Sequence, residues 1–129
     1  GNPVSCAAAM AVLEEIKEQD LVANARRVGE HAWARLNALA DRHEAIGDVR
    51  GSGLIFGAEM VLDRDTKAPA SAFTDRVVNA MRQRGIIHSK LGRHKNTLKI
   101  RPPMPFSIEH ADLLFDTLDD VLTETPLVP

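Results

Sequence analysis

The feature that most constrains the fold is a change of hydrophobic period near residue 46. From residue 3 to about residue 43, apolar residues recur at three- and four-residue intervals, which is the spacing of helices. The segment IGDVRGSGLIFGAEMVL, residues 46–62, instead alternates along the chain and contains four glycines. Because the chain carries both periods, we expect an α+β domain in which helices pack on a sheet.

Two helices are predicted before this change. The first covers about Pro3–Glu18, with Asn2 as its N-cap, and its early turns are apolar on nearly every side. Such a helix is either buried or wedged between domains. The second begins after Asp20, a predicted N-cap, and fades near His43. Its buried stripe is predicted to contain Leu21, Ala25, Val28, Ala32, Leu36 and Leu39.

The glycine-containing segment predicts two strands. We expect a short strand over Ile46–Arg50, a turn at Gly51–Gly53 and a longer strand over Leu54–Leu62. One face of the longer strand collects Leu54, Phe56, Ala58, Met60 and Leu62. Because the connection is short, the two strands should pair antiparallel.

The second half of the chain repeats this mixture of helix and strand. A helix is predicted over Ala72–Arg84 with Gly85 after its end, followed by short strands at Ile86–Ser89 and Thr97–Arg101. Ser107 should cap a last helix, and residues 125–129 should be loose. The buried helix residues should be Phe73, Val77 and Met81, then Ile108, Ala111, Phe115, Leu118 and Leu122. The predicted order is α-α-β-β-α-β-β-α, with helices covering one face of a small sheet.

Composition limits the possible partners. The chain has 129 residues, enough for one domain, and its net charge of −2 does not favour nucleic-acid binding. It has one cysteine, so no internal disulfide is possible, which suits a reducing cytoplasm. No apolar run is long enough to span a membrane or resembles a secretory signal. We therefore expect a cytoplasmic protein that binds neither nucleic acid nor membrane.

The segment TLKIRPP holds the candidate binding residues. On a strand, Leu98 and Ile100 point to one face, while Lys99 and Arg101 point together to the other, just before two prolines. Two cations on one face can hold a carboxylate or a phosphate. Spacing alone favours a solvated basic face, although the preceding turn GRHKN adds further positive charge nearby.

No catalytic or metal centre is predicted from the residues themselves. Arg50-Gly51-Ser52-Gly53 lacks the spacing of a phosphate loop and precedes a strand, so a tight turn is the better interpretation. The five histidines share no metal-ligand spacing. Two alternatives stay open at this point. The chain could be a free-standing α+β domain that binds an anionic metabolite or regulates another protein, or it could be a purely structural interaction domain.

Three segments together resemble one protein family. GNPVSCAAAMAVLEEI, IGDVRGSGLIFGAEMV and NTLKIRPPMPFS occur in the order and spacing of the C-terminal part of class III aminotransferases, which depend on pyridoxal phosphate. The resemblance covers nearly the whole chain. It implies the small C-terminal domain of a fold-type I pyridoxal-phosphate enzyme, with residues 1–19 as an interdomain linking helix and residues 20–129 as the small domain. It also implies that the large cofactor-binding domain is missing and that the chain is a fragment.

The resemblance carries further expectations. In the family, the lysine that forms the Schiff base lies upstream of the part matched here, so this chain should contain no catalytic and no cofactor-binding residue and should be inactive alone. The parent enzyme would be a homodimer that binds pyridoxal phosphate and moves an amino group from a small amino donor to a 2-oxo acid.

One departure from the family pattern concerns the substrate. The family pattern Arg-x-x-Pro-Pro places an arginine on the substrate carboxylate, and the matching position here is Lys99. With Arg101 two residues later, the segment resembles the branch of ethanolamine-phosphate phospho-lyases. The resemblance therefore implies that Lys99 and Arg101 bind the substrate anion, either a carboxylate or a phosphate.

Overall fold

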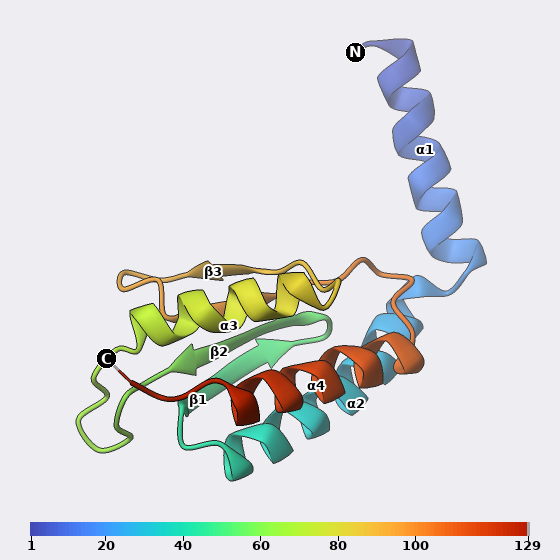
Figure 1. The fold of residues 1–129 in the computed structure, drawn as a ribbon. Helices are drawn as coiled ribbons and strands as arrows, with labels where there is room; N and C mark the ends of the chain where they lie inside the picture. The colour runs from blue at the N-terminus through green and yellow to red at the C-terminus, as the bar shows by residue number, and fades with distance from the viewer. Residues whose placement is uncertain (129) are drawn as a thin grey trace.

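The computed structural model describes residues 1–128, which form four helices and four strands. Figure 1 shows how these elements are arranged. The elements are α1 (Pro3–Glu18), α2 (Leu21–Arg42), β1 (Ile46–Ser52), β2 (Ile55–Met60), α3 (Ser71–Gln83), β3 (Ser89–Leu91), β4 (Thr97–Ile100) and α4 (Ile108–Glu124). The predicted order and the α+β class are both confirmed.

The strands form one antiparallel sheet in the order β1-β2-β4-β3. Strand β1 continues to Ser52, which pairs with Ile55, so the predicted end at Arg50 is wrong. The turn is the two residues Gly53 and Leu54, and Gly53 has a φ of 55°. This left-handed conformation is open to glycine, and it lets the first strand run two residues longer than expected.

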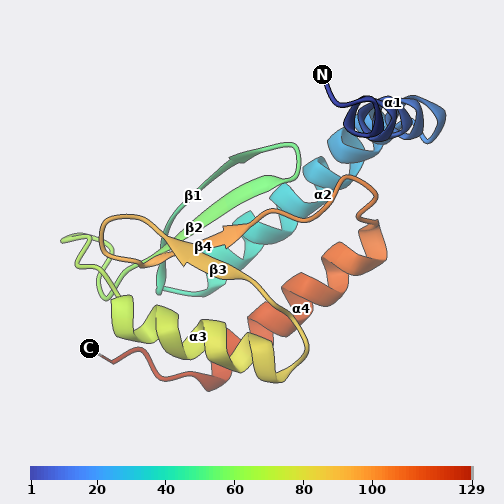
Figure 2. The ribbon, with the colours of Figure 1, turned by 90° about the horizontal axis from the view of Figure 1, so that it is seen from above.

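Helices α2, α4 and α3 lie together on one side of the sheet (Figure 2). The alternation along β2 follows from this arrangement: Phe56, Ala58 and Met60 are buried beneath the helices, whereas Ile55 is exposed on the other side. We call that other side the open face. Lys99 belongs to it as well, because it pairs across the sheet with Gly57 and Ser89.

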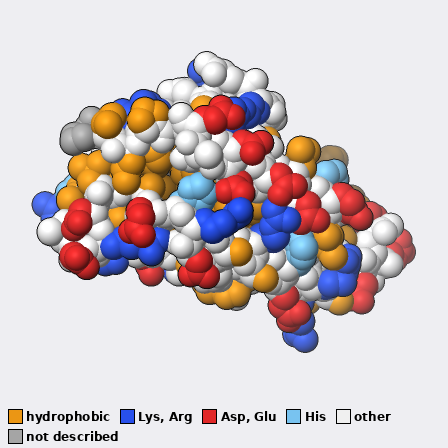
Figure 3. Space-filling view, turned by 60° about the horizontal axis from the view of Figure 1, so that its bottom comes forward, with side chains coloured by type: hydrophobic (Ala, Val, Ile, Leu, Met, Phe, Trp, Pro, Cys, Tyr) orange, Lys and Arg blue, Asp and Glu red, His pale blue; other side chains and the backbone are white. Residues whose placement is uncertain are grey.

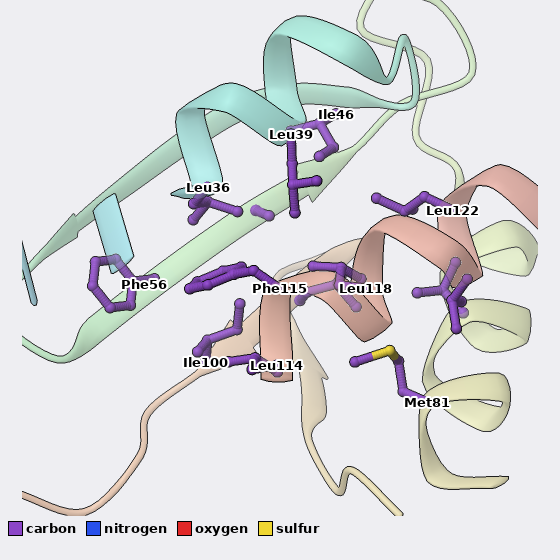
Figure 4. Packing of buried hydrophobic residues seen from close by; sticks show 14 of the residues in the cluster. Leu36, Leu39, Ile46, Phe56, Met81, Ile100, Leu114, Phe115, Leu118 and Leu122 are labelled. Carbon is purple, nitrogen blue, oxygen red and sulfur yellow. The ribbon is translucent and has the colours of Figure 1, made fainter. Parts of the chain in front are cut away.

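The core lies between the helices and the covered face. Phe115 and Leu118 of α4 are fully buried and extend toward Leu36 and Leu39 of α2 (Figure 4). The predicted stripes of the last three helices are confirmed in this cluster. Among the predicted members, Ala25 and Ile108 are partly buried against this cluster, and Leu21 is half-buried outside it.

Charged residues close the outer side of the contact between α2 and α4. Nε2 of His31 lies 2.7 Å from a carboxylate oxygen of Asp112, and Nε2 of His43 lies 2.6 Å from one of Asp119. We call the charged residues that pair across this contact the charge seam. They are His31, Arg35, Arg42, His43, Asp112, Asp116 and Asp119. Figure 3 views the molecule from this side, where acidic, basic and histidine side chains are intermingled.

Helix α1 stands apart from the rest of the fold. Asn2 caps it as predicted, accepting a hydrogen bond from the Val4 amide at 2.9 Å. The helix points away from the sheet (Figure 1), contacts only α2 and buries none of its residues. Val4, for example, is 76% exposed.

Three local predictions are wrong. Asp20 makes no side-chain cap for α2; it adopts a left-handed conformation, φ 46°, in the tight turn that joins α1 to α2. Residues 86–88 pair with no other strand, and β3 begins only at Ser89. The tail is held as far as residue 128, because the Arg76 side chain donates to the carbonyls of Pro126 and Val128, while residue 129 lies outside the described chain.

Candidate anion-binding site

Strand β4 and the proline pair set the directions of the two candidate cations. Leu98 and Ile100 are buried in the core, as predicted, which leaves Lys99 on the open face. Arg101 is the first residue after the strand and is exposed. A residue before proline favours extended backbone, so Arg101 continues the alternation of the strand. Both residues line the same hollow.

Neither cation has an internal partner among residues 1–128. The ion pairs of the sheet region occupy other residues: Arg50 pairs with Asp48 and Glu59, and Lys90 pairs with Asp75. The pKa of Arg50 is raised, mainly by its hydrogen bond to Glu59 and then by that to Asp48. Lys99 and Arg101 are in no ion pair of the described chain, so their charges are not neutralised internally.

The hollow that the two cations share has a volume of about 740 Å³. Its walls come from three segments: residues 85–89, residues 99–106 and the first half of α4. Apolar groups such as Ile87, Phe106 and Leu113 dominate, and no aspartate or glutamate is among the lining residues. An anion entering this hollow would therefore meet two positive charges without a competing carboxylate.

The hollow exists because two neighbouring strands separate. Pairing of β3 with β4 stops at Ser89 and Lys99. Beyond this pair, Pro102 and Pro103 have no amide N–H to donate, so the segment at residues 86–88 has no ladder to join. The predicted strand at Ile86–Ser89 fails for the same reason.

The segment after Arg101 is anchored by a residue that the sequence analysis did not identify. The amide of Asn24, in the first turn of α2, donates to the carbonyls of Met104 at 2.8 Å and Phe106 at 3.0 Å. Ser107 then caps α4 as predicted, accepting from the His110 amide at 3.2 Å. No sequence signal marks Asn24, because its partners lie about 80 residues away.

Two further basic or histidine groups near β3 behave differently from expectation. Arg93, His94 and Lys95 of the turn do not line the hollow, so the turn does not add to the cation pair as predicted. His88 lines the hollow, but both of its ring nitrogens are buried without a hydrogen-bond partner. Burial lowers the pKa of His88, which keeps its ring neutral near neutral pH.

The described residues contain neither a candidate metal site nor a candidate membrane-spanning helix. Residues 1–128 contain no group of three or more His, Cys, Asp or Glu side chains placed to share a metal ion. Within the same residues, no helix has both the length and the apolar character needed to cross a membrane.

Comparison with known proteins identifies the family of the chain. The profile of the family described as aminotransferase class III matches residues 1–122. The chain belongs to this family. Class III aminotransferases depend on pyridoxal phosphate and act on small amines and oxo acids.

Relatives within the class III family differ in the reactions that their names state. The chain is 41% identical over 92% of its length to alanine–glyoxylate aminotransferase 2 homolog 2, mitochondrial, of Arabidopsis thaliana. It is 38% identical over 95% of its length to ethanolamine-phosphate phospho-lyase homolog 1 of Caenorhabditis elegans. A leucine/methionine racemase of Thermococcus litoralis is 40% identical over 96%. The chain spans about a quarter of each, 25%, 27% and 28% respectively.

Solved structures of a phospholyase and a transaminase share the fold. An Arthrobacter phospholyase, determined with phosphoethanolamine, matches with a TM-score of 0.92 and 41% identity over 96% of this chain and 29% of its own. A transaminase determined with L-alanine matches with a TM-score of 0.87 and 35% identity over 96% of this chain and 28% of its own. The predicted resemblance to the small domain of fold-type I enzymes is thus confirmed as a fold.

Proposed function

We propose that this chain serves as the small domain of a longer class III enzyme and binds the anionic end of the substrate through Lys99 and Arg101. The observation that carries the proposal is the pair of unneutralised cations in a hollow lined by no acidic residue. An ammonium and a guanidinium at the end of one strand would hold the far end of the substrate while its amine reacts elsewhere.

In this proposal, residues 1–19 form the helix that links the small domain to a large one. Helix α1 buries nothing within residues 1–128, yet Val4, Met10, Val12 and Leu13 are exposed along it. Exposed apolar groups of this size indicate a surface that another part of a protein covers. Ile55, exposed on the open face, supports the same conclusion for the sheet.

The reaction proposed for the whole enzyme is transfer of an amino group from an amine or amino acid to a 2-oxo acid. The donor leaves as a carbonyl compound and the acceptor leaves as an amino acid, so the two substrates exchange an amino group and an oxygen. Bound pyridoxal phosphate would supply the electron sink for the carbon that loses its proton. Lys99 and Arg101 would orient the substrate and neutralise its anionic end.

A phospho-lyase reaction is the second candidate, favoured by Lys99 at the position where the family has arginine. In that reaction a phospho-amine loses a proton and inorganic phosphate, and water then releases ammonia and a carbonyl compound. A lysine is a compact charge that suits a phosphate, whereas the planar fork of arginine suits a carboxylate. Arg101, beside Lys99, keeps the carboxylate alternative open.

The residues of this chain do not fit pyridoxal phosphate by themselves. The ring nitrogen of the cofactor needs an acidic partner, and no carboxylate lines the hollow that contains Lys99. Of the other lysines, Lys90 is paired with Asp75 and Lys67 donates to the Gly47 carbonyl. We therefore propose that the cofactor lysine and its pocket lie in the large domain, and that the chain alone is inactive.

The alternative function is a free-standing domain that binds an anionic metabolite. It is favoured by one observation: the core contains no residue of α1, so α2, α3, α4 and the sheet form a complete cluster. The two functions differ in their dependence on upstream sequence. An in-frame large domain with a reactive lysine would exclude the free-standing domain.

We further propose that the intact enzyme is a cytoplasmic homodimer that binds neither nucleic acid nor membrane. The lone thiol of Cys6 is exposed on α1, which suits a reducing compartment. Sedimentation would measure the oligomeric state, and a fluorescent fusion would report the location, with a mitochondrial signal contradicting the proposal.

The proposed function is tested by assaying the chain with and without the coding sequence that precedes it. Each protein is incubated with pyridoxal phosphate, and the visible absorption band of the bound cofactor and the conversion of amino donors are measured. The longer protein should show both, and the chain alone should show neither. A stoichiometric band on the chain alone, removed by replacing one lysine, would overturn the proposal.

A further inference from the structure

We propose that the hydroxyl of Ser89 is a third donor of the anion site and that it selects a phosphate over a carboxylate in the substrate. The inference rests on the proposed function, because Ser89 would complete the site formed by Lys99 and Arg101. It assigns the preference for phosphate to Ser89 of β3, whereas Lys99 lies on β4.

The register of the sheet places the three donors together. Ser89 of β3 lies directly opposite Lys99 of β4, and side chains of such a pair leave the sheet on the same face, with Cβ atoms about 5 Å apart. Arg101 follows Lys99 by two residues, which is about 7 Å along extended backbone. All three residues line the hollow. The three residues therefore lie together where two neighbouring strands border the hollow.

The Ser89 hydroxyl is not used within the described chain. The side-chain hydrogen bonds around it belong to other residues: Lys90 donates to Asp75, and the hydroxyl of Ser71 donates to the His94 carbonyl. Among residues 1–128, Ser89 forms no side-chain hydrogen bond and is exposed. Like the two cations, it is open to an external acceptor.

The other neighbour of Lys99 on the open face is a glycine. Across β2, Lys99 pairs with Gly57, which pairs in turn with Arg50. A Cβ atom at Gly57 would lie 3.3 Å from Cγ2 of Thr97 and 3.8 Å from Cγ of Arg50. The space above Gly57 is therefore bordered by Thr97 and by Arg50, whose guanidinium is paired with Asp48 and Glu59.

The chemistry of the two anions explains why a third donor discriminates. A carboxylate is planar, and one guanidinium fork satisfies both of its oxygens. A phosphate ester presents three terminal oxygens in a tetrahedral arrangement, so an ammonium, a guanidinium and a hydroxyl can each receive one. Removing the hydroxyl then leaves a phosphate oxygen without a donor, but leaves a carboxylate with both of its partners.

The experiment compares variants of the intact enzyme that contains this chain. kcat/KM is measured on phosphoethanolamine and on 4-aminobutyrate, together with the competitive inhibition constants of inorganic phosphate and acetate. Ser89→Ala should lower kcat/KM for phosphoethanolamine and weaken phosphate inhibition by about tenfold or more, since a hydrogen bond to a charged group is lost. The values for 4-aminobutyrate and acetate should change less than about threefold.

Two control variants make the result specific. Ser89→Thr keeps the hydroxyl on a strand and should retain most of the phosphate preference. Ser52→Ala removes a hydroxyl from the end of β1, away from this hollow, and should change neither constant. Thermal unfolding should be unchanged in all three, because Ser89 and Ser52 are exposed.

Lys99→Ala separates this inference from the proposed function. Suppose that Lys99→Ala weakens the binding of both anions, while Ser89→Ala weakens the binding of both equally or of neither. The role given to Ser89 is then wrong, but the anion site formed by Lys99 and Arg101 stands. If neither variant changes any of the four constants, the anion site itself is wrong. An enzyme that prefers acetate to phosphate, with or without the hydroxyl, would also overturn the inference.

Discussion

Helices α1 and α4 have almost the same length, 16 and 17 residues, yet they relate to the molecule in opposite ways. Helix α4 buries six residues in the core, and its outer charges join the charge seam with α2. Helix α1 buries none. The same contrast separates the paired cations of the seam from unpaired Lys99 and Arg101. Apolar and charged side chains that have partners within residues 1–128 stabilise the fold. Apolar and charged side chains without such partners indicate where an external group binds.

The largest expected difference is in amide hydrogen exchange between the two helices. In dilute 129-residue chain, α4 should exchange only through opening events that approach global unfolding, about 5–15 kcal/mol, whereas α1 should open at close to 0 kcal/mol. Mass spectrometry of exchanged peptides measures both. Equal protection of α1 and α4 in the monomer would remove the basis of the comparison.

Replacing Lys99 should change substrate use without changing stability. One charged hydrogen bond to a bound anion contributes about 1.5–3 kcal/mol, so Lys99→Ala should lower kcat/KM for an anionic amine roughly tenfold to hundredfold in the intact enzyme. A neutral amine should lose much less. An equal loss on charged and neutral substrates would show that Lys99 has only a structural role.

The replacement Lys99→Arg sharpens the same experiment. If the substrate is a phospho-amine, the planar fork should not restore full activity, whereas with an α-amino acid it should match or improve the native enzyme.

Asn24 of α2 is hydrogen-bonded to the segment that follows Arg101 and borders the anion site. Asn24→Ala removes two hydrogen bonds to the segment that follows Arg101, at a cost of about 1–2 kcal/mol. The freed segment should raise KM for anionic substrates more than it lowers kcat. Asn37→Ala is the matched control, because Asn37 donates only to Trp33 within its own helix. Identical kinetics in both variants would contradict a positioning role for Asn24.

The charge seam should affect stability alone. Asp119→Asn weakens contacts to Arg42 and to the largely buried His43, and it should lower the free energy of unfolding by about 1 kcal/mol. Asp120→Asn makes the same charge change at the next residue, which is exposed and forms no ion pair within residues 1–128, and should have little effect. Denaturant unfolding distinguishes the two. A loss of substrate binding in Asp119→Asn would contradict the assignment of the charge seam to stability alone.

His88 should give the smallest effect, visible in the pH dependence of stability. Its pKa is lowered by burial, so the folded chain binds this proton less readily than the unfolded chain. The contribution to stability is full above the unfolded pKa of about 6.5 and declines as the pH falls below it. His88→Leu should reduce the decline in the unfolding free energy between about pH 7.5 and 5.5. An unchanged slope would show that the histidine is not responsible.

The sequence was most informative where one face of an element is buried. The stripes around Leu36, Val77 and Phe115 and the alternation at Leu98 and Ile100 predict their elements, because burial requires apolar side chains at a fixed period. Local chemistry also predicted the caps at Asn2 and Ser107.

What could not be predicted depends on groups far apart in the chain or on backbone geometry. The contacts of Asn24 cross about 80 residues, and the opposition of Ser89 and Lys99 depends on a register that a short edge strand does not encode. Asp20 was predicted as a cap because its type favours that role, but the turn between two helices required a left-handed residue there.

The turn at Asp20 makes α1 a lever. A helix of 16 residues is about 24 Å long, and it leaves the domain through Gln19 and Asp20, two residues that carry no side-chain cap. A change of only 10° in direction at this point displaces the far end of α1 by about 4 Å relative to the sheet. When Gly1 is held by a fixed body, the same rotation carries Lys99, Arg101 and the whole open face toward that body or away from it.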